Sequence, residues 1–114
     1  MTSRHAAAGL PPAPVGLMAV AIGCFQVILA WTECGDGGLG FRIEREVGIG
    51  SAGLFSEIGR VGQHVTAFRD GSIRPRTTYF YRVLAWNPAG ASSPSNVVEV
   101  TTAQAETELQ ADQE

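Results

Sequence analysis

The residues Thr78–Asn87 read T-Y-F-Y-R-V-L-A-W-N, and they restrict the fold more than any other segment of the chain. Aromatic and β-branched residues favour extended backbone, and neither Gly nor Pro interrupts this run. Successive side chains of a strand point to opposite faces. One face therefore carries Tyr79, Tyr81, Val83 and Ala85. The P-A-G-A-S-S-P-S sequence that follows is typical of a turn, so we predict a long strand that ends in a tight connection.

Six further segments have the length and the apolar alternation of short strands. They are Leu17–Ile22, Phe25–Trp31, Phe41–Val47, Leu54–Val61, His64–Phe68 and Asn96–Thr102. Between them lie segments rich in residues that favour turns, namely Thr32–Gly40, Gly48–Gly53, Asp70–Arg76 and Pro88–Ser95. No segment shows the apolar period of an amphipathic helix. Seven strands without a helix predict an all-β fold, a seven-stranded antiparallel β-sandwich.

The two ends of the chain lack the alternation of the central part. Residues 1–10 are rich in Ala and Gly, and residues 103–114 are acidic with almost no apolar face. We expect a flexible N-terminal segment, a domain at 11–102 and a flexible C-terminal tail or linker. The formal net charge of −3 comes from the ends, because seven Arg and seven carboxylates balance within 11–102.

This charge pattern limits the possible partners. A neutral domain without a basic stripe argues against nucleic-acid binding, which needs clustered positive charge. The apolar run Val15–Trp31 contains Gly23 and Gln26 and is too short for a membrane span, so we expect no membrane insertion and no convincing signal peptide. The basic residues are all Arg, which is typical of codon usage in a GC-rich genome.

An ordered set of motifs over about 11–102 resembles fibronectin type III domains. The set comprises Pro11, Pro14 and Leu17, then Trp31, then Phe41 and Ile43, then Ile73, Pro75, Thr77 and Tyr79, then Tyr81, Val83, Ala85 and Asn87, then Gly90, Ser92, Pro94 and Ser95, and finally Val98, Val100 and Thr102. The resemblance implies an immunoglobulin-like sandwich with a tyrosine corner, in which the Tyr79 hydroxyl bonds to backbone of the preceding loop. It also implies a structural core of Trp31, Phe41, Ile43, Tyr79, Tyr81 and Val83.

Residue types that carry chemistry are few and separate. Cys24 and Cys34 flank a predicted strand, which holds them too far apart for a disulfide, so we expect two free thiols. His64 has no evident catalytic partner in the sequence. Glu33 and Asp36 are too few ligands for a calcium site. We therefore predict no catalytic residue, no metal and no cofactor, and we expect that the chain is not an enzyme.

The second face of Thr78–Asn87 is unusual, because three of its four outward side chains are large and apolar. With flanking residues it forms a candidate interaction face of Arg42, Glu44, Phe80, Arg82, Leu84, Trp86 and Val97. Two readings stay open. The face contacts a partner, with Trp86 and Arg82 as anchors, or the stems of Arg42 or Arg82 cover its rings locally. The loops Thr32–Gly40 and Pro88–Ser95 form a second candidate.

These observations favour a non-catalytic binding or spacer module that contacts a protein partner or neighbouring domains. We expect it in a larger bacterial protein that is secreted or located in the cell envelope. The alternative is a self-assembling structural subunit that packs through edge strands or through the outward face of Phe80, Leu84 and Trp86.

Overall fold

A computed structural model describes residues 9–48 and 53–104, and within these ranges it contains strands and no helix. The strands are β1 (Val15–Ile22), β2 (Gln26–Thr32), β3 (Gly40–Val47), β4 (Ser56–Gly62), β5 (Ala67–Asp70), β6 (Thr78–Asn87), β7 (Gly90–Ala91) and β8 (Val98–Thr101). All of their pairings are antiparallel. The predicted all-β antiparallel sandwich is therefore confirmed.

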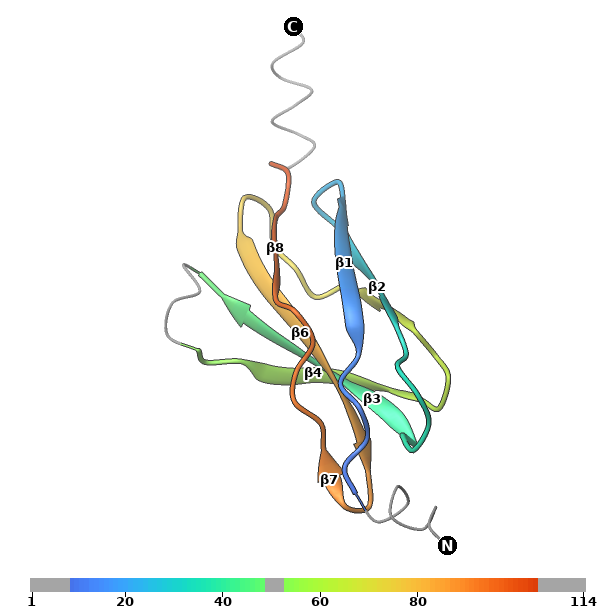
Figure 1. Ribbon diagram of the computed structural model, residues 1–114. Helices are drawn as coiled ribbons and strands as arrows, with labels where there is room; N and C mark the ends of the chain where they lie inside the picture. Colours follow the sequence, from blue (N-terminus) through green and yellow to red (C-terminus); the bar gives the residue numbers. More distant parts are fainter. Residues whose placement is uncertain (1–8, 49–52, 105–114) are drawn as a thin grey trace, which may run out of the picture.

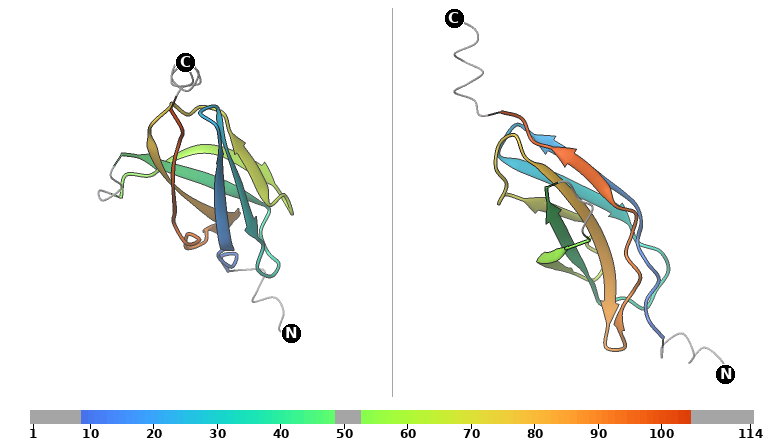
Figure 2. Two further views of the ribbon diagram at one scale, coloured as in Figure 1. Left: turned by 90° about the horizontal axis from the view of Figure 1, so that it is seen from above. Right: turned by 90° about the vertical axis from the view of Figure 1, so that its left-hand side faces the viewer.

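The strands form two sheets that face each other (Figures 1 and 2). The smaller sheet has the order β1-β2-β5, and the larger sheet has the order β4-β3-β6-β7. β8 also pairs with β6, on the side where β7 lies, so these two strands follow one another along one edge of β6. β1 and β8 lie side by side, although they belong to different sheets (Figure 1). The Asn96 side chain joins them, because its amide both donates to and accepts from the Leu17 backbone.

The structure has eight strands where the sequence predicted seven, because β7 precedes the predicted last strand. The predicted strand His64–Phe68 begins later, and β5 occupies Ala67–Asp70. The reason is a turn at His64, which has a φ of 67°. Three expectations fall partly outside the described residues: the turn Gly48–Gly53, the flexible segment 1–10 and the tail 103–114.

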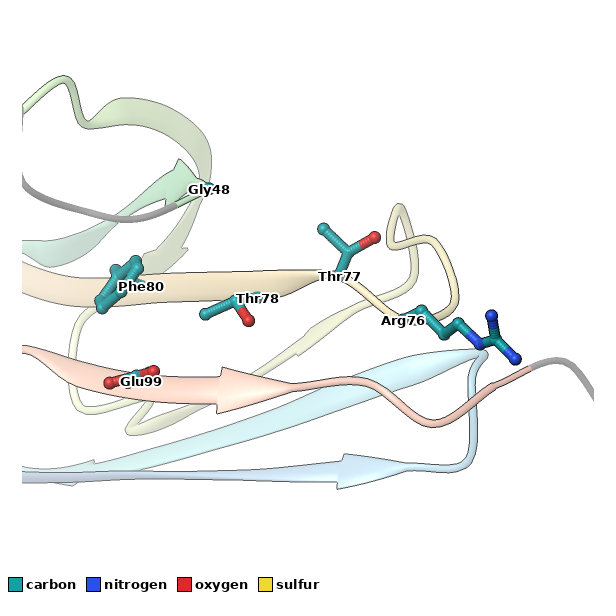
Figure 3. A pocket seen from close by; sticks show the side chains of 6 residues that line it. All are labelled: Gly48, Arg76, Thr77, Thr78, Phe80 and Glu99. Atoms are coloured by element: carbon teal, nitrogen blue, oxygen red, sulfur yellow. The ribbon is translucent and has the colours of Figure 1, made fainter.

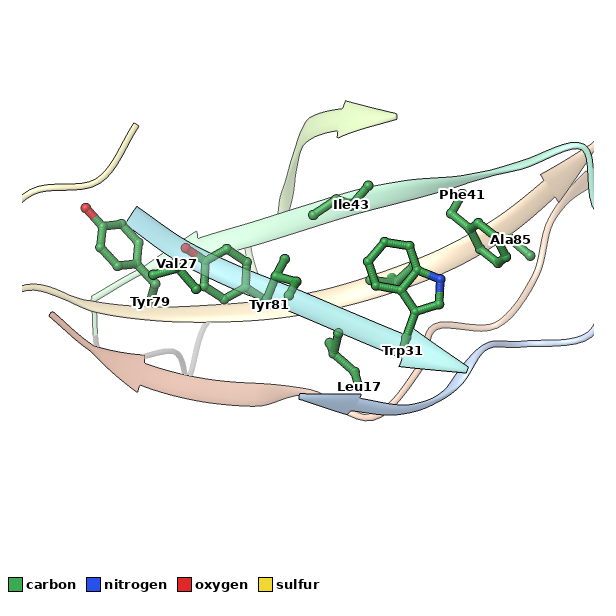
Figure 4. Close-up of a cluster of buried hydrophobic side chains, with 10 residues drawn as sticks. Leu17, Val27, Trp31, Phe41, Ile43, Tyr79, Tyr81 and Ala85 are labelled. Atoms are coloured by element: carbon green, nitrogen blue, oxygen red, sulfur yellow. The ribbon is translucent and has the colours of Figure 1, made fainter. Parts of the chain in front are cut away.

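The core fills the space between the sheets and takes side chains from both (Figure 4). Its buried members are Leu17, Val27, Leu29, Trp31, Phe41, Ile43, Tyr79, Tyr81, Val83 and Ala85. Trp31 meets Phe41 edge to face across the sandwich, with ring centroids 5.5 Å apart. Contacts of this kind add to the burial of large aromatic surfaces.

The predicted tyrosine corner is present. The Tyr79 hydroxyl accepts a hydrogen bond from the Arg74 amide at 2.8 Å. Thr102 closes the same corner from the other side, because its hydroxyl donates to the Arg74 carbonyl and accepts from the Thr77 amide. These bonds satisfy backbone groups of the loop between β5 and β6, which would otherwise be costly to bury.

Between β7 and β8, serine side chains replace strand pairing along β6. The Ser92 hydroxyl accepts from the Ala85 amide at 2.9 Å, and the Ser95 hydroxyl accepts from the Val83 amide at 3.0 Å. The amides of both serines donate to the carbonyls of the same two β6 residues. Both serines are buried. The S-S-P-S sequence thus continues the hydrogen bonding of β6 across a segment where a regular strand is interrupted.

Candidate functional site

The predicted interaction face lies on the outer side of the larger sheet. Register places Arg42 opposite Leu84 and Glu44 opposite Arg82, so their side chains share this side of the sheet. The sequence suggested an open apolar strip, but Leu84 is only 6% exposed and Glu44 only 8%. The expectation that Leu84 is available to a partner is therefore wrong. Phe80, Arg82 and Trp86 are half-buried, whereas Val97 is 50% exposed.

Charged side chains cover this face. Glu44 lies between two guanidinium groups, at 2.7 Å from Arg82 Nε and 3.1 Å from Arg42 Nε. On the neighbouring β4, Arg60 forms a two-pronged contact with Glu57. The Arg60 contact lowers the pKa of the Glu57 carboxyl, and it raises that of the guanidinium. Register also places Glu46 and Glu99 opposite Phe80 on this side of the sheet, so its three arginines are matched by four glutamates and the face carries no excess of positive charge.

Two arginines also stack on aromatic rings of the same face. The Arg60 guanidinium carbon lies 5.7 Å from the Trp86 ring centre, and that of Arg82 lies 4.2 Å from the ring centre of Phe55. Local covering by arginine is thus present, but by different pairs from those expected. Arg60 covers Trp86, and Arg82 covers a ring of the neighbouring segment. Such contacts are worth about 0.5–1 kcal/mol at exposed sites.

Phe80 lies at one end of the face, beside a shallow hollow of about 500 Å³ (Figure 3). The hollow is lined by Gly48, Arg76, Thr77, Thr78, Phe80 and Glu99. The hydroxyl of Thr78 is engaged with that of Thr101 at 2.8 Å. The hollow therefore presents one aromatic ring together with one positive and one negative side chain.

A buried polar cluster around Asp70 was missed by sequence analysis, which placed Asp70 in a turn. Asp70 is 3% exposed and ends β5. Its Oδ2 accepts from the Tyr81 hydroxyl at 2.6 Å and from Arg45 Nη1 at 2.8 Å, and its Oδ1 accepts from the amide and hydroxyl of Ser72. Tyr81 and Arg45 belong to the larger sheet, so the carboxylate joins the two sheets. An Asp-Gly pair after a strand is ambiguous, and no sequence signal distinguishes this role from a turn.

The pKa values within this cluster shift in opposite directions. Burial raises the pKa of Asp70, but the hydrogen bonds from Tyr81, Ser72 and Arg45 outweigh burial and hold the pKa below its usual range. Burial, together with the bond to Asp70, raises the pKa of Tyr81. The folded protein thus holds a charged carboxylate against a neutral phenol.

The loops of the second predicted site meet at one end of the sandwich. The Asn87 side-chain amide donates to the carbonyls of Gly9 and Gly37, and its carbonyl accepts from the Ala89 amide. Nearby, Glu33 contacts His64 Nδ1 at 3.0 Å. Both cysteines are free, with Cys24 buried and Cys34 exposed. Within 9–48 and 53–104 no group of three His, Cys, Asp or Glu side chains is arranged to hold a metal.

The outer face of the smaller sheet carries large apolar side chains that sequence analysis did not single out. Met18, Val20 and Ile22 of β1 are 65%, 56% and 45% exposed, and Phe25 in the following turn is 62% exposed. These residues alternate along β1 with Leu17, which points inward, and this alternation is the sequence signal that could have identified them. In the part of the chain that the structure describes, no helix is long and apolar enough to cross a membrane.

This architecture resembles that of known proteins. No family model matches the chain, and no curated protein matches it. Among solved structures, the FN1–FN3 domains of chicken CNTN1 superpose with a TM-score of 0.75 at 18% identity, over 83% of this chain and 33% of that chain. A domain of human fibronectin type III domain containing protein 3 superposes with a TM-score of 0.69 at 27% identity, over 85% of this chain and 90% of that chain.

A fibronectin type III domain of human contactin 1 has a TM-score of 0.75 at 21% identity, over 86% of this chain and 83% of that one. This chain spans about one third of the multi-domain CNTN1 and titin structures that it matches. The fold is an immunoglobulin-like β-sandwich. More narrowly, the chain has the fold of fibronectin type III domains. Domains of this class are commonly non-catalytic modules for protein interaction.

Proposed function

We propose that residues 11–102 form a non-catalytic module that separates neighbouring domains and contacts a protein partner. We place it in a larger bacterial protein that is secreted or located in the cell envelope. The spacer role is supported by one observation, which is that the described chain enters and leaves at opposite ends of the sandwich (Figure 1).

Both ends are attached to the body of the domain. At one end the Gly9 carbonyl accepts from the Asn87 side chain. At the other end the Ala103 amide donates to the Gly23 carbonyl, and the Ala103 carbonyl accepts from the Arg76 amide. Segments joined to the two ends are therefore held apart by the length of the sandwich.

The spacer role can be tested by placing the chain between two fluorescent proteins. We expect narrowly distributed energy transfer that does not change with ionic strength. A Gly/Ser linker with the same number of residues is the control, because its ends lie about 50–60 Å apart on average but vary widely, which gives a broad distribution of transfer. A distribution as broad as that of the linker would contradict the proposal.

For the partner-binding role, we propose the outer face of the larger sheet. Arg82 and Arg42 retain partly exposed side chains, and Trp86 lies two residues beyond Leu84 along β6, opposite Gly40. Arginine and tryptophan are the residue types that most often anchor protein contacts. Because Leu84 is buried, we do not assign self-association to this face.

Paired variants test this face. Wild-type chain, Trp86→Ser and the control Val65→Ser are immobilised, and proteins retained from extracts of the source organism are compared by mass spectrometry. Val65 is exposed in the turn before β5, away from the larger sheet's outer face. We expect a protein that wild type and Val65→Ser retain and Trp86→Ser does not. Equal retention by all three would overturn the assignment of this face.

A further inference from the structure

The apolar surface of β1 and β2 lies on the solvent side of the smaller sheet. Register forms rows across the sheet: Met18 faces Ala30, Val20 faces Ile28, and Ile22 faces Gln26. The third strand contributes Ala67 and Arg69 beside Ala30 and Ile28. We call Met18, Val20, Ile22, Phe25, Ile28 and Ala30 the β1–β2 face. Its members are exposed or half-buried, and no described segment covers them.

β1 is apolar on both sides, and β2 adds Ile28 and Ala30 to the outward side, between the polar Gln26 and Thr32. The inward side of β1 carries Leu17, Ala19 and Ala21, which pack on the core, while the outward side carries larger residues. Antiparallel sheets with one face in water ordinarily alternate apolar with polar residues, and strands apolar on both sides are typical of sheets covered on both faces. The composition of these strands therefore indicates that the outer side of the smaller sheet is also covered by a contact.

The other sheet shows what a solvated face of this domain looks like. There, arginine and glutamate side chains cover the apolar groups, with ion pairs at Glu44 and Glu57. The β1–β2 face has no equivalent cover of charged side chains from its own strands, because no residue from Val15 to Thr32 is charged. Arg69 is the one charged side chain in the described rows, and it lies on β5, beyond Ile28.

The extent of the face matches what a dimer requires. Five large apolar side chains, several more than half exposed, leave on the order of 500 Å² of apolar surface in water, which is near the upper end for a monomer. A standard interface buries about 800 Å² per partner, of which somewhat more than half is apolar. The β1–β2 face alone would supply the apolar part.

The absence of charge indicates which partner fits. A twofold contact places the same surface against itself, so a patch whose charges are all of one sign repels its copy. A surface without charges avoids this repulsion, and it offers no charged group to orient an acidic or basic partner. We propose that two copies of this chain associate through the β1–β2 face. This goes beyond the binding role given above and does not depend on it.

Analytical ultracentrifugation of the full chain, from about 5 to 500 µM, tests the proposal. We expect wild type to pass from monomer to dimer over this range. Val20→Glu places a charge at the centre of the face, and burying an unpaired charge weakens association by about 100-fold or more. Leu54→Glu is the matched control, because Leu54 is also exposed, at 73%, and receives the same charge directly before β4, the edge strand of the larger sheet. It should dimerise like wild type.

Thermal unfolding monitored by circular dichroism establishes that both variants are folded, since each substitution is at an exposed position. Should Val20→Glu not fold, Met18→Gln provides the same test with a neutral side chain at the most exposed position of the face. A wild-type chain that stays monomeric at 500 µM would overturn the proposal and leave a different protein as the occupant of the face. Equal dimerisation of Val20→Glu and Leu54→Glu would overturn it as well.

Discussion

At the scale of single residues, Asp70 determines how the two sheets are joined. A carboxylate that is 3% exposed would be unfavourable without partners, but Asp70 accepts bonds from Tyr81, Arg45 and Ser72. Arg45 in turn lies 5.0 Å from the ring centre of Tyr79. Removing one member of such a network leaves the others buried without partners, and this cost exceeds the net value of the bonds.

Asp70→Asn keeps the shape of the side chain and removes its charge. We expect it to lower the free energy of unfolding by about 1–3 kcal/mol at pH 7, because hydrogen bonds to charged groups contribute more than neutral ones. Urea unfolding measures this. Asp36→Asn on an exposed loop is the control and should change stability by less than about 0.5 kcal/mol.

The difference in stability between wild type and Asp70→Asn should depend on pH. The pKa of Asp70 is lower in the folded than in the unfolded protein, so its charged form stabilises the fold above the unfolded pKa of about 3.9. That contribution is lost as the pH falls below this value and through the folded pKa. The stability difference between wild type and Asp70→Asn should therefore shrink at acidic pH. A difference that stays constant from pH 7 to about pH 2.5 would contradict the assignment.

At the scale of elements, β6 depends on two serine hydroxyls where its neighbouring strand is interrupted. Ser92→Ala and Ser95→Ala each leave a buried amide of β6 with no acceptor. We expect each to cost about 1–3 kcal/mol in urea unfolding. Ser93→Ala, in the same segment but exposed, should stay within about 0.5 kcal/mol of wild type. Similar effects for all three variants would show that the hydroxyls do not act as acceptors.

The contact between β4 and β5 depends on the absence of a side chain at Gly59. A Cβ at this position would lie 2.6 Å from two ring carbons of Phe68. We expect Gly59→Ala to cost about 1–3 kcal/mol by overpacking, and Phe68→Leu in the same chain to recover part of the loss. Gly62→Ala in the same strand is the control, since no atom lies within 4 Å of its Cβ position. Equal unfolding midpoints for the two alanine variants would contradict the contact.

Sequence alternation was informative for β3, which has one apolar and one polar side, and β3 was predicted within a residue of its bounds for this reason. β6 was predicted because an unbroken run of strand-favouring residues ends at Pro88. β5 was predicted to begin too early, because Val65 and Phe68 are residues typical of a strand. In the structure the chain still turns at His64, whose backbone is left-handed, and the strand begins only at Ala67. The candidate site was predicted in part. Alternation identified which side chains face outward on β6, but not that Arg60 from another strand would cover Trp86.

At the scale of the whole molecule, each sheet contains one tryptophan, Trp31 in β2 and Trp86 in β6. Bonds from Asp70 and Asn96 connect the sheets, so we expect them to unfold together. In Trp86→Phe the fluorescence reports the smaller sheet, and in Trp31→Phe it reports the larger one. In each variant the fluorescence and circular dichroism transitions should coincide. An offset in either variant would show that one sheet unfolds first.

The link between Leu17 and Asn96 has a mechanical consequence. β1 and β8 run in the same direction, because Leu17 meets Asn96 and, further along both, Gly23 meets Ala103. Tension applied at the two ends of the domain pulls these segments past one another in shear. The two bonds of the Asn96 side-chain amide and the bond between Ala103 and Gly23, with no ladder of backbone pairs between the strands, would resist the first displacement. Under force this contact would yield before the ladder that holds β1 to β2.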